Sequence, residues 1–173
     1  MVEKFKDNTP EKDRKSPFSW FSVTNQNALA NSLSLEVTKQ VIEDFSTNFV
    51  FKQVSRRIDN PDFIMKGVIN KFVGKTRLTT YGIISLISIY GILTWYFGIP
   101  IQVNETEMEL IVSLYDTKGE LVGKYSGIYK DKDLTSIYNS NQLALPNKTN
   151  KSFSNSVQQI RDQILNDATK YEK

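Results

Sequence analysis

The chain contains neither cysteine nor histidine. Without cysteine there is no disulfide, thiolate nucleophile, iron–sulfur cluster or thiolate zinc site. Without histidine, the Ser–His–Asp triad, the histidine-ligated metal and the usual proton shuttle are excluded. Carboxylate or lysine chemistry remains open, but the sequence carries no catalytic, metal-binding or cofactor motif. We therefore expect a protein that is not an enzyme, with a carboxylate-dependent hydrolase as a minor alternative.

The chain also lacks an excess of charge of either sign. Its 22 Lys and Arg residues nearly balance its 19 Asp and Glu residues, which leaves a net charge of +3. A dedicated nucleic-acid binder would concentrate positive charge on one face, so nucleic acid is not an expected partner. The 173 residues include 39% hydrophobic ones, which is enough for one buried core. A single domain is the natural expectation.

The first 17 residues predict a disordered, charged tether ahead of that domain. Nine of them are charged, with both signs interspersed, and Pro10 and Pro17 interrupt any helix. Such a segment buries too little apolar surface to offset its loss of conformational entropy. It is typical of the polar spacer of a mature bacterial lipoprotein, with Met1 in place of the lipidated cysteine; a plain cytosolic tail is the alternative. Residues 18–173 form the predicted domain.

Apolar periodicity predicts two helices. Apolar side chains recur every four positions from Leu29 to Phe45, and a second stripe with 4-3-4-4-3 spacing runs from Phe153 to Tyr171, with Thr149 or Ser152 as the N-cap. Aromatic, β-branched or alternating stretches predict the strands, which are expected at 18–23, 49–54, 63–73, 107–114 and 121–129.

A compact turn at Asp116–Gly119 joins the last two predicted strands, with Gly119 free to adopt a positive φ, and residues 131–148 read as a loop. Strands and helices in this order favour an α+β fold, with a mainly antiparallel sheet that carries both helices on one face.

The longest uncharged run covers residues 78–104, 27 in succession. In its densest part, residues 81–101, seven Ile, two Leu and one Phe contribute about −3 to −6 kcal/mol to insertion in a bilayer, which Ser, Thr, Gly and Pro partly offset. Lys71, Lys75 and Arg77 precede it and a row of glutamates follows, as expected at a membrane boundary.

Three interpretations of this insert remain open. A hairpin that turns near Gly91, with arms over 83–90 and 92–97, would dip into a membrane or pack against other subunits. A single crossing of the bilayer would separate strands that belong to one sheet, and a buried core segment is the third possibility. The residues predicted to contact membrane or subunits are Tyr81, Ile83, Ile84, Leu86, Ile87, Ile89, Tyr90, Ile92, Leu93, Trp95, Tyr96, Phe97 and Ile99.

Glu105, Glu107 and Glu109 alternate along a predicted strand and therefore share one face, about 7 Å apart. With Asp116 or Asp131 they would suit a hard cation such as Ca²⁺. A solvated strand face is the simpler interpretation and the one we prefer.

Several stretches together resemble a class of small bacterial envelope lipoproteins, whose domain is similar to the N-terminal domain of TolB and to the lipoproteins of curli and polysaccharide export. They follow the charged start and the first helix of the chain. The stretches are Phe49–Val54, Pro61–Ile69, Phe97–Pro100, Glu109–Asp116 and Gly123–Gly127.

This resemblance implies a structural or assembly component of a larger envelope complex, on the periplasmic side of the outer membrane and held there by a lipid anchor. The implied partners are membrane lipid, other envelope proteins and further copies of the chain, with no cofactor. The alternative is a carrier or binding module, in which the apolar segment lines a pocket for a lipid or another hydrophobic ligand.

Overall fold

The structure, a computed structural model, describes residues 1–10, 13, 22–24, 33–80, 83, 88, 93, 96–136 and 144–168. Its centre is an antiparallel meander of three long strands, β3 (Ile64–Leu78), β4 (Gln102–Tyr115) and β5 (Leu121–Thr135). Two short strands pair with β3: β1 (Lys6–Asp7) in parallel and β2 (Ser22–Thr24) antiparallel. The order across the sheet is β1-β3-β4-β5.

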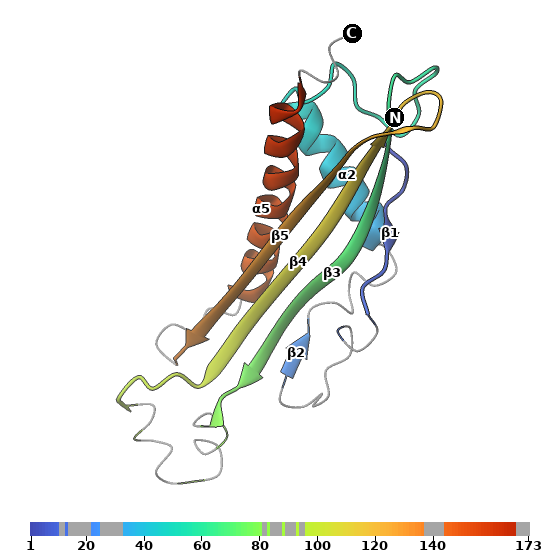
Figure 1. The fold of residues 1–173 in the computed structure, drawn as a ribbon. Coiled ribbons are helices and arrows are strands. Elements are labelled where there is room, and N and C mark those ends of the chain that lie inside the picture. The colour runs from blue at the N-terminus through green and yellow to red at the C-terminus, as the bar shows by residue number, and fades with distance from the viewer. Residues whose placement is uncertain are drawn as a thin grey trace.

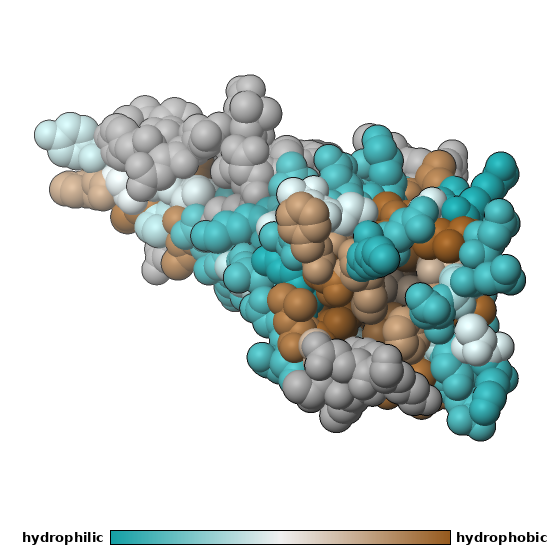
Figure 2. Space-filling view, turned by 90° about the horizontal axis from the view of Figure 1, so that it is seen from above, coloured by the Kyte–Doolittle hydropathy of each residue, from teal (hydrophilic) through white to brown (hydrophobic). Residues whose placement is uncertain are grey.

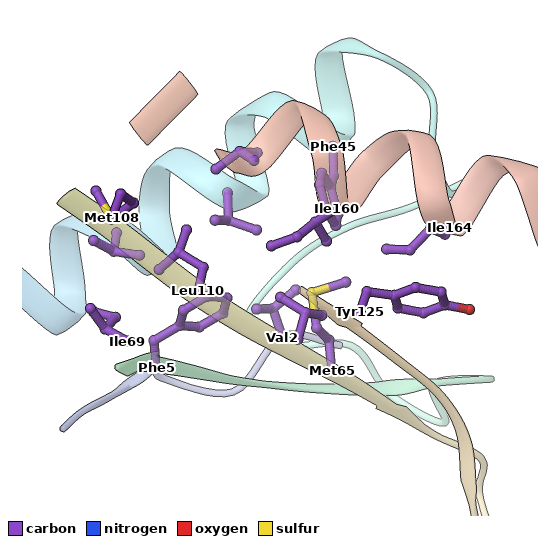
Figure 3. Close-up of a cluster of buried hydrophobic side chains, with 14 of the residues drawn as sticks. Val2, Phe5, Phe45, Met65, Ile69, Met108, Leu110, Tyr125, Ile160 and Ile164 are labelled. Atoms are coloured by element: carbon purple, nitrogen blue, oxygen red, sulfur yellow. The ribbon is translucent and has the colours of Figure 1, made fainter. Parts of the chain in front are cut away.

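Two helices, α2 (Leu33–Thr47) and α5 (Ala144–Asn166), lie on one face of this sheet (Figures 1 and 3). The predicted α+β class, with a mainly antiparallel sheet and both helices on one face, is confirmed. The helices are joined by an ion pair in which Arg161 Nη1 lies 2.8 and 2.9 Å from the two carboxylate oxygens of Asp44.

The core lies between the helices and the inner face of the sheet (Figure 3). The period of four in α2 and of three to four in α5 places one apolar stripe of each helix inward, and the period of two in β4 does the same for alternate residues. The buried side chains of these three elements are Leu33, Val37, Val41, Phe45, Met108, Leu110, Val112, Leu114, Val157, Ile160 and Ile164.

The prediction of a disordered tether is wrong for residues 1–10. Val2 and Phe5 are buried in the core, 2% and 1% exposed, and β1 pairs in parallel with Val68 and Ile69 of β3. The backbone N–H of Phe5 donates to Thr38 Oγ1 of α2 at 2.9 Å. The prediction failed because the segment is highly charged and Val2 and Phe5 are its only buried apolar residues. Pairing with the edge of β3 provides hydrogen-bond partners for the backbone of the segment. Of residues 11–17 the structure describes Asp13 alone.

The predicted strand at 49–54 is also wrong. α2 ends at Thr47, Phe49 follows it with a φ of 53°, and residues 49–54 cross the end of the sheet without forming a strand. Val50, Phe51 and Val54 pack against the core from there. Their β-branched and aromatic character therefore reflects burial against the core rather than membership of the sheet.

Several strands and one helix are longer in the structure than the sequence predicted. β3 continues to Leu78 and β5 to Thr135, and α5 begins at Ala144, so that Thr149 and Ser152 lie inside the helix and not at its N-cap. Ser152 is buried, and its hydroxyl lies 2.8 Å from the hydroxyl of Thr106. Of the strand predicted at 18–23, the structure describes residues 22 and 23, which belong to β2.

The long strands give the domain two distinct ends (Figure 1). Fifteen residues of β3 extend over about 45 Å. The turn end carries residue 1, the segment 48–63 and the Asp116–Gly119 turn, which has the predicted positive φ of 83° at Gly119. The insert end is the end at which β3 ends and β4 begins.

Candidate functional site: an apolar tip and a cavity at the opposite end

The insert leaves the sheet and returns to it at the same point. β3 and β4 stay paired as far as Leu78 and Gln102. Beyond them the N–H of Thr79 donates to the carbonyl of Ile101 at 2.9 Å, and its hydroxyl donates to the carbonyl of Pro100 at 2.9 Å. A single bilayer crossing would require these flanks to lie on opposite sides of the membrane, so that interpretation is wrong. None of the helices in the described residues is long and apolar enough to cross a membrane.

The described part of the insert presents large apolar side chains to solvent. Tyr96 and Phe97 are 76% and 70% exposed, and Ile83 and Leu93 are 41% and 51% exposed. We call the described residues between Thr79 and Pro100 the apolar tip. The buried-core interpretation is wrong for these four residues, because a core segment would cover them.

Local geometry holds the last aromatic pair of the tip in place. The N–H of Phe97 donates to the carbonyl of Leu93 at 3.0 Å, and Gly98, with φ of 64°, turns the chain toward Pro100. The rings of Tyr96 and Phe97 meet edge to face, with centroids 5.5 Å apart. Ile99 is only partly exposed. The other predicted contact residues, Tyr81, Ile84, Leu86, Ile87, Ile89, Tyr90, Ile92 and Trp95, lie outside the described residues.

The glutamate row lies on the outer face of the sheet, opposite the helices, and is matched by cations from both neighbouring strands. Glu107 lies 2.5 Å from Lys71 Nζ and 2.6 Å from Lys130 Nζ. Glu105 pairs with Arg77 and, at 3.4 Å, with Lys132. We call these six residues the charge ladder.

Hydrogen bonds shift the pKa values of the residues at the centre of the charge ladder. Burial disfavours the charged form of Glu107, but hydrogen bonds from Lys130 and Lys71 outweigh it and hold the pKa of this carboxyl below its ordinary value. The hydrogen bond to Glu107 likewise raises the pKa of Lys71. Glu109 accepts from the Asn70 amide at 2.9 Å. No group of acidic side chains in the described ranges is arranged to hold a metal ion, so the ladder is an ion-paired strand face.

A cavity of about 930 Å³ opens at the turn end, where the segment 48–63 passes over the ends of β3, β4 and α5. No described residue of the apolar tip lines it. The carrier hypothesis expected a pocket lined by the insert, and this cavity is formed by other residues. The sequence analysis did not predict this cavity. The apolar run at 49–54, which was assigned to a strand, contains residues that line it.

No family model matches the chain, and no curated protein matches it in sequence. Among solved structures, a Xanthomonas campestris protein of the DUF330 family is similar over 99% of this chain and 86% of its own, with a TM-score of 0.55 and 10% identity. At that identity the likeness shows a shared fold.

Two further structures are more distant. A candidate lipoprotein of Caulobacter crescentus has a TM-score of 0.41 and 13% identity, covering 81% of this chain and 84% of its own. Lipoprotein GNA1162 of Neisseria meningitidis has a TM-score of 0.31 and 12% identity, covering 88% and 93%. The expected likeness to TolB and to curli lipoproteins is not confirmed. Fold and site define an α+β domain with an apolar tip at one end and a cavity at the other.

Proposed function

We propose that the chain is a non-enzymatic accessory component of the bacterial cell envelope, which attaches to a lipid surface through its apolar tip. The observation that carries the proposal is the exposure of Tyr96 and Phe97, which precede β4 at the insert end. Exposed apolar patches of this kind mark membrane or protein contacts. An aromatic pair beside aliphatic side chains also matches the composition of membrane–water interfaces.

The hydrogen-bonded base of the apolar tip supports a shallow insertion of the tip into lipid. Because Thr79 and Ile101 are hydrogen-bonded to each other, the tip enters and leaves the lipid on the same side. The sheet itself then stays in water, where its ion-paired outer face is solvated. Inside a structural complex, such a tip would orient the domain relative to the membrane plane.

A lipid anchor and the outer membrane remain predictions. Residue 1 lies at the turn end, opposite the tip. An anchor joined there by a short linker would therefore hold the opposite end of the domain, about 45 Å from the tip along β3. Anchor and tip would then contact different surfaces.

Co-sedimentation with phosphatidylcholine vesicles tests the proposal. The full chain is expected to bind, and a Tyr96→Ser, Phe97→Ser variant is expected to bind at least about tenfold more weakly, because each lost aromatic contact is worth about 1.5–3 kcal/mol when fully buried. The matched control, Phe49→Ser with Leu121→Ser, removes two side chains that are 87% and 56% exposed at the turn end. It should bind like the unaltered chain.

Two results would contradict the proposal. One is an absence of vesicle binding by the full chain, and the other is an equal loss in the test and control variants. If the full chain binds no vesicles but forms oligomers that depend on Tyr96 and Phe97, the tip contacts a second copy instead of lipid.

A further inference from the structure

The cavity at the turn end has an apolar floor and a polar rim. Its apolar floor is made by half-buried side chains of the segment 48–63, which lie over the core residues Val2, Met65, Leu114 and Ile164. These half-buried side chains are Val50, Phe51, Val54, Ile58 and Phe63. Figure 2, which looks onto this end, shows brown apolar side chains gathered in a hollow and surrounded by teal hydrophilic ones. The volume of about 930 Å³ falls in the range of pockets that enclose small ligands.

The rim carries charges of both signs. Lys52 stands on one part of the segment 48–63, and Asp59 and Asp62 on another, all three with exposed side chains. A ligand with an apolar chain and a head group of both signs would match the two regions, with its cation near the carboxylates and its anion near the lysine. The amino group of Met1 also lines the cavity, donates to the carbonyl of Phe63 at 2.7 Å and interacts with Asp62, so the rim balances two carboxylates with two ammonium groups.

The backbone turns sharply at two points of the segment 48–63. Among the described residues, the non-glycine residues with positive φ are Phe49 (53°) and Asn60 (50°). At Phe49 the left-handed backbone caps the carboxyl end of α2, where the N–H of Val50 donates to the carbonyl of Phe45 at 3.0 Å. Asn60 lines the cavity, and asparagine tolerates this backbone region. The two turns direct the segment across the end of the core.

We propose that this cavity binds a single-chain zwitterionic amphiphile, with the acyl chain on the apolar floor and the head group among Lys52, Asp59 and Asp62. The site is separate from the apolar tip, at the other end of the sheet. The chain would thus contact lipid in two ways, as a surface through the tip and as a single molecule through the cavity.

Calorimetric titration of the full chain with 16-carbon lysophosphatidylcholine, below its micelle concentration, tests this proposal. Leu165 lines the cavity and is 45% exposed, while Leu35 is 46% exposed on α2 and does not line it. Leu165→Glu is expected to weaken binding about tenfold or more, because it places a carboxylate against the acyl chain. Leu35→Glu, the matched control, should leave the affinity unchanged.

Saturable one-to-one binding that is lost in Leu165→Glu alone supports the proposal. Absence of saturable binding, or an equal effect of both substitutions, would overturn it. Tighter binding of palmitate than of the lysolipid would overturn the assignment of a zwitterionic head group.

A variant in which Asn-Gly replaces residues 79–101 separates this site from the proposed function. Leu78 and Gln102 are already paired, so a two-residue turn can close the hairpin. This variant should lose vesicle binding and keep lysolipid binding. Loss of lysolipid binding in a correctly folded variant would overturn the cavity as the site, whatever the vesicle result.

Discussion

At the scale of single residues, the helix layer depends on one glycine. Gly127 lies on β5 beneath α5, where an added Cβ would fall 2.0 Å from the carbonyl oxygen of Ser156. The partner is backbone and cannot rotate away. The hydroxyl of Ser156 bonds to the carbonyl of Ser152 at 2.9 Å, so this part of the helix is itself buried and fixed.

Gly127→Ala is therefore expected to lower the free energy of unfolding by about 3 kcal/mol, at the upper end of overpacking effects. Urea denaturation measures the change. Gly119→Ala is the control, because an added Cβ there meets nothing within 4 Å and only the positive φ costs about 1–2 kcal/mol. Equal losses in the two variants would show that α5 does not approach β5 this closely.

At the scale of elements, the amino-terminal segment is part of the fold. Gly67 of β3 leaves space for the Phe5 ring, since an added Cβ would lie 2.3 Å from it. Parallel pairing with β3 adds hydrogen bonds such as Asn8 N–H to the Ile69 carbonyl at 2.8 Å. The segment closes one edge of the sheet, which would otherwise be open to pairing with another chain.

Phe5→Ala is expected to lower the free energy of unfolding by about 3–5 kcal/mol, because it empties a buried site. A disordered tether would show no change. Phe49→Ala provides the matched control: its ring is 87% exposed, so the effect should stay within about 0.5 kcal/mol. Urea midpoints of the two variants decide between the alternatives, and a Phe5→Ala midpoint equal to that of Phe49→Ala would contradict the packing.

Regular repetition made some elements predictable from the sequence. The four-residue period of α2 and the alternation of β4 each reflect one apolar face, and the Asp116–Gly119 turn carries its own signal: the Asp116 carboxylate accepts the N–H groups of Lys118 and Glu120. The amino-terminal segment and the cavity gave no such repetition. Their apolar residues pack against partners far along the chain, such as Gly67 for Phe5, and local periodicity does not register such contacts.

The tip illustrates the same limit. Its lack of charge identified a segment that leaves the core, and the exposure of Tyr96 and Phe97 agrees with that. Its closure between Thr79 and Ile101 depends on the register of two strands that the insert separates. Sequence reasoning therefore left a single crossing open, which the pairing excludes.

At the scale of the whole molecule, two apolar ends are separated by a sheet whose outer face is balanced in charge. Near the tip, the cations of the charge ladder are already paired: Lys71 and Lys130 with Glu107, and Arg77 and Lys132 with Glu105. Each free lysine or arginine near an anionic surface would add about 1 kcal/mol to binding. Paired cations contribute little of this, so attachment through the tip should be driven by apolar contact.

Vesicle binding by the full chain is therefore expected to change less than about threefold when anionic lipid is added to phosphatidylcholine, or when NaCl rises from about 0.05 to 0.5 M. Glu105→Gln with Glu107→Gln removes the two carboxylates of the charge ladder and serves as the positive control. This variant should bind anionic vesicles more tightly at low salt, by up to about tenfold because attraction to the lipid surface falls off within a Debye length, and lose the gain at high salt. A requirement for anionic lipid in the unaltered chain would show that charge, rather than the exposed aromatic pair, holds the domain at the membrane.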